Sequence, residues 1–386
     1  MNIRPRIESS MSELVEWRRH LHAHPELGFE EKQTAAFVAR KLREFGLEVH
    51  EGIGRTGVVG VLRQGNGRMV GLRADMDALP IAEATGLPYA STAAGRMHAC
   101  GHDGHIAMLL GAARLLAETP PSHGSVLFIF QPAEETLGGG KAMVEAGLFR
   151  DFPACAVFGL HNWPGLPEGQ FAVHTGPVMA ANDTFEVIVE GRASHAAMPH
   201  QGVDPIAISA QLYHAWQLIV SRGVSPTDAA VISVTQVHAG DTWNVVPDKL
   251  VMRGTVRTLR PETRDMIETR MREQTDLICR AFEAHAEVDY QRRYPVTINT
   301  EAEAQISRLA AADTSASEVV VNLAPSMAAE DFSYMLQEKP GAYVWLGSGS
   351  AENGRNLHSP RYDFNDAILS TGVEYWVKLA HRALRA

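Results

Sequence analysis

Three short apolar runs, each followed by acids or a histidine, constrain the fold of this chain more than any other feature of its sequence. The runs and the polar residues behind them are 69–73 with Asp75 and Asp77, 125–130 with Glu134 and Glu135, and 155–160 with His161. Each run has the length and the aliphatic and aromatic content of a strand buried on both faces, as in a largely parallel sheet covered by helices. Because ligands of open α/β sheets bind beyond the carboxyl ends of the strands, these polar residues predict a site at that edge.

A cluster of potential metal ligands lies at residues 98–105, with the sequence HACGHDGH. Cysteine sulfur and histidine nitrogen bind borderline transition metal ions, and the spacing of Cys100 and His102 lets both point at one cation where the backbone is extended or turning. A helical run at 106–117 follows directly, which puts His102 and His105 near a helix N-terminus. By itself the cluster also fits a polar loop with a buried, hydrogen-bonded histidine and a small apolar cysteine.

The order of strand-like and helix-like segments predicts two domains, one inserted into the other in sequence. Helical spacing at 10–24 and 31–45 opens the chain, and the alternation of strand and helix signals that follows is typical of α/β proteins. Residues 182–294 have the order β-α-β-β-α-β of a split βαβ, ferredoxin-like unit. We therefore predict an α/β catalytic domain in residues 1–181 and 295–386, with a mixed, mostly parallel sheet flanked by helices. Residues 182–294 are predicted to form an inserted α+β lid or dimerisation domain.

Composition and charge exclude several other classes of protein. The 386 residues are 45% hydrophobic and 21% charged, which is enough for one large domain and a smaller one. The net charge is −10 and there is no basic block, so we expect no nucleic-acid partner. Three cysteines argue against a disulfide framework. The chain opens without an apolar signal region and no run approaches the roughly 20 apolar residues of a membrane span, so we expect a cytoplasmic protein with no membrane partner.

Six short motifs, in order along nearly the whole chain, resemble those of the M20 metallopeptidase family. They are MHACGHD at 97–103, QPAEE at 131–135, GLH at 159–161, SHAAMP at 194–199, NVVPD at 244–248 and NLHSP at 356–360. More narrowly, they resemble the amidohydrolase branch of the family, which includes hippurate hydrolase, N-acyl-amino-acid amidohydrolases and plant auxin-conjugate hydrolases. The family's architecture, a dinuclear-metal α/β domain with an inserted lid, agrees with the pattern of strands and helices. One departure is Thr136, because the branch usually carries Gly directly after the paired glutamates.

The resemblance implies a site for two divalent metal ions. The implied metal ligands are Cys100, His102, Glu135, His161 and His358, and Glu134 is the implied general base. This mixed set of sulfur, nitrogen and oxygen donors suits Zn²⁺ and is compatible with Mn²⁺, Co²⁺ or Ni²⁺. Two cations about 3.5–4 Å apart lower the pKa of a water molecule and orient it at the scissile carbonyl, while the general base takes up its proton.

The adjacent Glu134 and Glu135 pose a geometric problem, because neighbouring side chains of a strand point to opposite faces. Pro132 ends the regular ladder before them, so we expect a turn that lets Glu135 bind metal while Glu134 faces the water. The alternative is that one of the two is a solvated surface acid.

Asp77 is predicted to orient a metal-binding histidine by accepting its second N–H. An equal alternative is that Asp75 and Asp77 only end the turn before Pro80. His98 and His105 are expected to be packing or supporting histidines rather than ligands. Asp103 and the pair Glu330 and Asp331 are given no role.

The inserted domain contributes three further candidates. His195 falls between a strand and a helix, where a lid could place it on the substrate carbonyl oxygen as an oxyanion donor; the alternative is a loop histidine that caps the next helix. Because the equivalent histidine can reach the partner's site in dimeric members of the wider family, the resemblance implies a homodimer or tetramer through this domain. Asn244 and Arg257 resemble residues that bind the substrate carboxylate, although Arg257 equally fits a surface residue paired with an acid.

The predicted function is metal-dependent hydrolysis of N-acyl amino acids, such as N-benzoyl or N-acetyl amino acids, into a carboxylic acid and a free amino acid. Hippurate is the first substrate to expect. A dipeptidase or carboxypeptidase with the same metals is the close alternative. A thiol amidase with Cys100 as nucleophile and a binding module without catalysis are two further alternatives, and Glu134 beside the ligands argues against the last of these.

Overall fold

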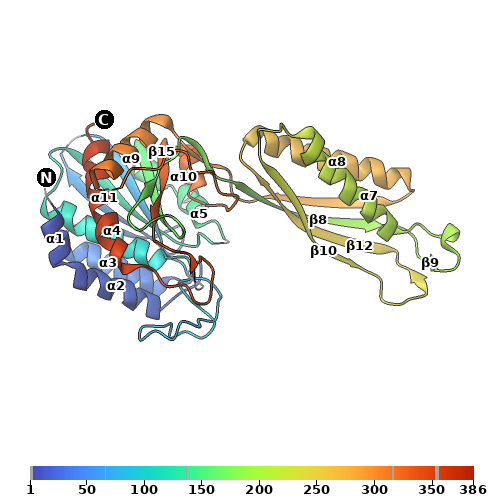
Figure 1. Cartoon of the computed structure of the whole chain (residues 1–386), viewed down its shortest axis with the longest axis horizontal. Helices are drawn as coiled ribbons and strands as arrows, with labels where there is room; N and C mark the ends of the chain where they lie inside the picture. The colour runs from blue at the N-terminus through green and yellow to red at the C-terminus, as the bar shows by residue number, and fades with distance from the viewer. Residues whose placement is uncertain (1–2, 66, 136, 315–316, 353–355) are drawn as a thin grey trace. The chain divides into compact units, whose positions relative to one another are not determined.

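The computed structural model describes residues 3–65, 67–135, 137–314, 317–352 and 356–386, which form two compact units (Figure 1). Unit 1 comprises Met1–Val178, Ile298–Ala324 and Asp331–Ala386, and unit 2 comprises Met179–Thr297 and Pro325–Glu330. Thr136, where the sequence departs from the family it resembles, lies outside the described residues. Within these ranges, no helix is both long enough and apolar enough to span a membrane.

A seven-stranded sheet forms the centre of unit 1, in the order β1-β2-β4-β3-β5-β15-β6. Its strands are β1 (Glu48–Ile53), β2 (Gly57–Gln64), β3 (Met69–Asp75), β4 (Gly124–Gln131), β5 (Ala156–Trp163), β6 (Phe171–Ala172) and β15 (Gly341–Gly347). β4, β3, β5 and β15 run parallel, and the other strands pair antiparallel at the two sides. Every residue of β3, β4 and β15 is buried, as expected for parallel strands covered on both faces. The predicted α/β class with a mixed sheet is confirmed.

Helices flank this sheet. They are α1 (Arg4–Ser9), α2 (Met11–Ala23), α3 (Lys32–Glu44), α4 (His102–Glu118), α5 (Gly139–Glu145), α6 (Leu148–Asp151), α9 (Glu301–Thr314), α10 (Ser333–Glu338) and α11 (Leu369–Ala383). α4 is buried along nearly its whole length because it packs against β3 as well as against α2 and α11. A helix that is apolar on all sides needs this central place. This packing holds the first turn of α4, which contains His102, inside the protein.

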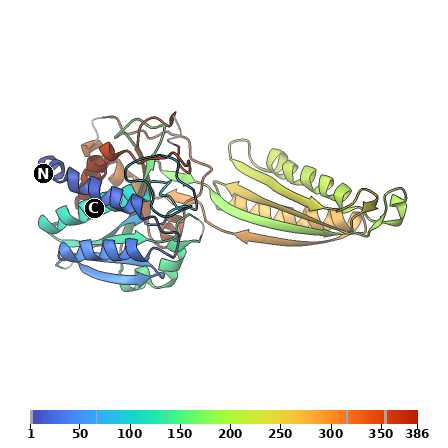
Figure 2. The same ribbon diagram turned by 90° about the horizontal axis from the view of Figure 1, so that it is seen from below.

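Unit 2 has a four-stranded antiparallel sheet in the order β10-β12-β8-β13. Its main elements are β8 (Ala181–Glu190), α7 (Pro205–Leu218), β10 (Ala230–Ala239), β12 (Lys249–Thr258), α8 (Pro261–Ala281) and β13 (His285–Arg292). Figures 1 and 2 show α7 and α8 side by side on one face of the sheet, so residues of β8 are alternately buried and half-exposed. This strand order is that of the ferredoxin-like unit. The action of unit 2 as a lid or dimerisation domain stays a prediction.

Two short strand pairings lie outside these two sheets. β9 (Ser194–His195) pairs with β11 (Val245–Val246), and β7 (Gly176–Met179) pairs with β14 (Thr297–Asn299).

The end of β5 differs from the expectation. The sequence places His161 beyond a strand that ends at residue 160, whereas β5 continues to Trp163. Pairing with β15 runs as far as Trp163, and its ring stacks on that of Trp345 with 4.0 Å between the centroids. The additional ladder and the stacked rings extend the strand, so His161 projects from a rigid element rather than from a loop.

Candidate metal centre

Potential metal ligands from separate segments of unit 1 lie within reach of one another. Among the described residues, one group of ligand atoms within 4.8 Å of each other comes from Cys100, His102 and His161, and another comes from Cys100, Glu135 and His358. Cys100 belongs to both groups. The structure therefore brings together the five residues whose type and motif imply metal binding, and their coordination of metal stays a prediction.

The two buried histidines are oriented by backbone carbonyls. Nδ1 of His102 is 2.8 Å from the carbonyl oxygen of Asp77, and Nδ1 of His161 is 2.7 Å from that of Asn162. A carbonyl oxygen only accepts, so each Nδ1 carries a proton, and Nε2 has a lone pair for a metal ion whenever the ring is neutral. Nε2 of His161 is 3.4 Å from Cys100 Sγ. Nε2 of His102 is buried with no hydrogen-bond partner among the residues that the structure describes, which fits a nitrogen built to bind a cation.

Negative charge gathers around these donors. Burial raises the pKa of the Cys100 thiol, and the nearby Glu135 carboxylate raises it further. Burial lowers the pKa of His102, but surrounding carboxylates, first of all Asp75, outweigh this effect and raise it to about 10. His358 Nε2 is 3.3 Å from Glu135, and this contact raises the histidine pKa. A divalent cation would balance this charge and deprotonate the thiol, so the donor set fits a metal.

The turn after β4 solves the problem of the two adjacent glutamates. β4 ends at Gln131, Pro132 follows, and Ala133 has a φ of 51° in the left-handed region. A Cβ on Gly139 would lie 1.7 Å from the carbonyl oxygen of Pro132, so only glycine lets the chain pass there. Carboxylate oxygens of both Glu134 and Glu135 then lie with His102 in a further group of ligand atoms within 4.8 Å. Neither glutamate is an exposed surface acid.

Asp77 fixes both this turn and His102. Its carboxylate accepts hydrogen bonds from the backbone N–H of Glu134 at 3.0 Å and of Glu135 at 3.1 Å. His102 is held chiefly by the Asp77 main chain, since the carboxylate oxygen is 3.4 Å from Nδ1. The carboxylate of Asp77 therefore supports the glutamates more directly than the histidine that the sequence suggested.

Removing this carboxylate should loosen the site. We expect Asp77→Ala to lower metal affinity and kcat/KM by about 10- to 100-fold, because two backbone N–H groups lose their acceptor. Metal titration and steady-state kinetics measure the effect. Asp77→Asn keeps one acceptor oxygen and is expected to fall between wild type and the alanine variant; wild-type metal affinity in Asp77→Ala would contradict this role.

A buried acid supports the same turn from the other end of the sequence. Glu31 Oε1 accepts a hydrogen bond from the backbone N–H of Ala133 at 2.8 Å, and Oε2 accepts one from the hydroxyl of Thr56 at 2.6 Å. Burial raises the pKa of Glu31 to about 7, because the ionised form has lost its water. In the unfolded chain this group ionises near pH 4.5. Between pH 4.5 and 7, folding is therefore accompanied by the uptake of one proton.

Glu31 is therefore expected to make stability depend on pH. Its native pKa lies above the unfolded one, so its contribution to stability is complete below about pH 4.5 and falls by about 3 kcal/mol as the pH rises from there through about 7. Glu31→Gln can keep both hydrogen bonds and carries no charge. Urea unfolding at pH 5 and pH 8 should show the variant more stable than wild type at pH 8 only; an identical pH dependence of the two proteins would contradict the assignment.

A buried polar network next to the donors was not predicted from the sequence. His105 Nδ1 is 2.6 Å from Asp75 Oδ1, and its Nε2 accepts the backbone N–H of Asn162 at 3.1 Å. Both ring nitrogens are thus engaged, which favours the expected supporting role of His105 over metal binding, and that role stays a prediction. Arg73, inside β3, donates to Asp75 at 2.7 Å. The sequence contains one signal for this network, which is an arginine within an otherwise apolar strand. A buried guanidinium requires anionic partners.

Two other polar residues of the HACGHDGH segment lie outside the donor groups. His98 is buried, and burial lowers its pKa to about 4, which favours the expected neutral packing role. Asp103 accepts from His22 Nδ1 at 2.9 Å and lies 3.7 Å from Arg18. It belongs to a buried ion-pair cluster between α2 and the first turn of α4 rather than to the donor groups.

The remaining predicted residues belong to unit 2. His195 and Asn244 are brought together by the β9–β11 pairing, since Ala196 N–H donates to the Asn244 carbonyl oxygen at 3.0 Å. The backbone N–H of Ala197 donates to His195 Nδ1 at 3.1 Å, so neutral His195 carries its proton on Nε2. Arg257 lies apart from both, in β12, where burial lowers its pKa. Their roles toward substrate stay predictions.

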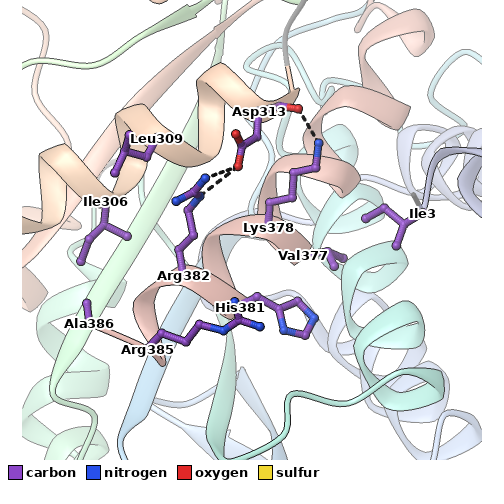
Figure 3. Close-up of a pocket in the computed structure, with 10 residues that line it drawn as sticks. All are labelled: Ile3, Ile306, Leu309, Asp313, Val377, Lys378, His381, Arg382, Arg385 and Ala386. Atoms are coloured by element: carbon purple, nitrogen blue, oxygen red, sulfur yellow. Dashed lines mark hydrogen bonds and ion pairs between the residues drawn. The ribbon is translucent and has the colours of Figure 1, made fainter. Parts of the chain in front are cut away.

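A cavity of about 490 Å³ lies elsewhere in unit 1, between α9 and α11 (Figure 3). Three of its charged residues already contact one another, since Asp313 accepts from Arg382 and, through its carbonyl oxygen, from Lys378. The cavity contains none of the predicted ligands and is not the metal centre.

Fold and site together define a metal-dependent hydrolase of the α/β type, with a cysteine shared by two donor groups and a second carboxylate beside them. Residues 71–382 match the Peptidase family M20/M25/M40, and the chain belongs to this family.

Relatives of known activity and structure are similar over the whole chain. A hippurate hydrolase of Campylobacter jejuni is 42% identical, with 100% of both chains covered. An N-acetyl-L-cysteine deacetylase of Bacillus subtilis is 41% identical, with 96% of this chain and 88% of the relative covered. The crystal structure of a dinuclear metal-binding peptidase of the M20 family from Bacillus subtilis is 35% identical, covers 98% and 99% of the two chains, and superposes with a TM-score of 0.87. Together with the donor groups, this supports a site for two divalent metal ions.

Proposed function

We propose that this protein hydrolyses the amide bond of N-acyl amino acids, giving a carboxylic acid and a free amino acid. The observation that carries the proposal is the shared thiol of Cys100 between two donor groups, with the buried carboxylate of Glu134 beside them. The similarity to a hippurate hydrolase and an N-acetyl-L-cysteine deacetylase supports an amidohydrolase of the aminoacylase type.

The five clustered donors, Cys100, His102, Glu135, His161 and His358, are proposed to hold the metal ions. When bound, two divalent ions polarise the scissile carbonyl and lower the pKa of the attacking water. Glu134 takes the proton of that water and returns it to the leaving nitrogen. Asp77 keeps the Glu134 backbone in place during both transfers. The donor chemistry favours Zn²⁺ or Mn²⁺, with Co²⁺ or Ni²⁺ also suitable.

His195, Asn244 and Arg257 are proposed to contact the substrate. The Nε2–H of His195 is available to donate to the carbonyl oxygen as negative charge develops there, because Nδ1 is engaged by Ala197. Asn244 on the neighbouring strand and the guanidinium of Arg257 would bind the carboxylate of the amino-acid half.

A substrate panel tests the proposed reaction. Metal-loaded protein is assayed with N-benzoylglycine, N-acetyl amino acids and free dipeptides, and the released amino acid is measured. Turnover of the N-acyl amino acids, with N-benzoylglycine among the best, supports the proposal. Faster turnover of dipeptides would assign the same centre to a dipeptidase or carboxypeptidase, and binding without turnover would overturn catalysis.

Location and assembly complete the proposal. The sparse, unpaired cysteines favour the cytoplasm. α7 exposes Ile206 and Tyr213 at 48% and 45%, and their spacing of seven residues puts both on one side of the helix, which supports association of two copies through unit 2. Light scattering after gel filtration tests it: a dimer is expected, and a monomer at micromolar concentration would contradict it.

A further inference from the structure

We propose that Asp331 is a positioning residue for Glu134: its buried carboxylate is anchored by three donors, and its backbone N–H holds the carboxylate of the general base. This inference rests on the proposed function, in which Glu134 transfers the proton. It concerns a residue to which the sequence motifs assign no role.

The anchor of Asp331 is built from three elements of unit 1. One carboxylate oxygen accepts from Gln131 Nε2, at the end of β4, at 2.6 Å and from Arg73 of β3 at 3.3 Å. The other accepts from the backbone N–H of Gly140 in α5 at 2.7 Å. Asp331 is fully buried. A buried carboxylate with this many donors has one position, and it fixes the backbone that carries it.

The backbone N–H of Asp331 points at the base. It donates to Glu134 Oε1 at 3.4 Å, a long hydrogen bond of the kind that tightens when substrate binds. The two residues are far apart in sequence, and Asp331 is where the chain re-enters unit 1 after Glu330. Anchoring this residue therefore holds the start of the returning segment against Glu134.

The close packing of α5 gives a second, independent observation. A Cβ on Gly140 would lie 2.8 Å from the carbonyl oxygen of Asp331. The Asp331 backbone thus approaches α5 as closely as a glycine permits, and any side chain there would displace it.

Arg73 links the Asp331 carboxylate to Asp75 and, through it, to His105. Its guanidinium donates to Asp331 and to Asp75, and Asp75 in turn contacts His105. A buried guanidinium held between two carboxylates loses much of its support when one becomes neutral. Neutralising Asp331 should therefore shift the segment that holds Glu134. Misplacement of a catalytic group by about 1 Å is enough to cost about 100-fold in rate.

Asp331→Asn tests the proposal through the division between kcat and KM. The amide has nearly the same shape, but its NH₂ group would face either the donors of Gln131 and Arg73 or the backbone N–H of Gly140. We expect kcat to fall by about 30-fold while KM stays within about threefold and the metal content is unchanged. A folded variant with kcat within about threefold of wild type would overturn the proposal.

The second arm repeats the substitution on a Glu134→Asp background. The shorter acid keeps a carboxylate but cannot reach the Asp331 N–H. If Asp331 acts through Glu134, Asp331→Asn should change kcat by less than about twofold there. An equal loss on both backgrounds, or a loss of metal, would assign Asp331 a general structural role and overturn the proposal.

One further variant tests the proposal independently, and another serves as a control. Gly140→Ala displaces Asp331 without removing its charge, and we expect kcat to fall by about tenfold with KM unchanged. If Asp331→Asn does not fold, this variant decides the question. Glu26→Gln is the matched control, because Glu26 is a buried carboxylate that accepts from Gln33 and Thr34 at the start of α3; it should lower the melting temperature without changing kcat. Full activity of Glu134→Gln would instead refute the proposed base, whatever Asp331 does.

Discussion

Replacing Glu134 with glutamine is expected to lower kcat by about 10³-fold while both metal ions stay bound. Glutamine has the shape of glutamate, and its amide oxygen can still accept the Asp331 N–H that Glu134 accepts. What it lacks is a group that binds a proton from water and releases it to the leaving nitrogen. Because binding groups are untouched, KM should change little, so the loss falls on the chemical step.

Kinetics must be paired with metal analysis for this prediction. Elemental analysis of the purified variant should give the metal content of wild type, since Glu134 lies beside the donor groups that contain Cys100 rather than within them. Glu135→Gln is the matched control on the adjacent residue, and it should lose metal together with activity. A Glu134→Gln variant that keeps more than about a tenth of wild-type kcat would show that another group transfers the proton.

The sequence was sufficient to predict helices with periodically spaced apolar residues and strands with continuous apolar runs. The apolar runs before Asp75, Glu134 and His161 are the central parallel strands, because buried parallel strands need no polar face. β1 and β2 were not predicted. β1 is short and largely exposed, so its composition resembles that of a loop, whereas β2 is as long as β4 and mostly buried and was missed although its apolar run is visible.

The candidate site likewise has residues that the sequence predicts and contacts that it does not. Cys100, His102 and His161 were found because their side-chain chemistry and motif spacing are visible in sequence. The main-chain carbonyls that orient the histidines, and the Asp77 carboxylate that holds the glutamate N–H groups, depend on tertiary contacts. A backbone group looks the same at every residue, so no sequence pattern could reveal these partners.

Cys100→Ser is expected to remove most of the bound metal and to lower kcat/KM by at least about 100-fold. The thiol belongs to both donor groups, so its loss weakens both metal positions at once. A serine hydroxyl keeps the size of the side chain but binds divalent metal poorly, because it does not ionise near neutral pH. Metal analysis and activity after reloading with Zn²⁺ or Mn²⁺ measure the effect. Treatment of wild type with a chelator should have the same result and should be reversed by metal.

The serine variant alone cannot separate a metal ligand from a nucleophile, because His161 Nε2 lies 3.4 Å from the thiol and could serve as its base. Cys100→Asp separates them. A carboxylate is an anionic ligand that binds the same divalent ions, yet it cannot form the thioester of a thiol amidase. We expect the aspartate variant to bind more metal than the serine variant and to exceed its kcat/KM by about tenfold. Equal inactivity of the two, with wild type unaffected by chelation but inactivated by iodoacetamide, would assign Cys100 the role of nucleophile and refute the metal mechanism.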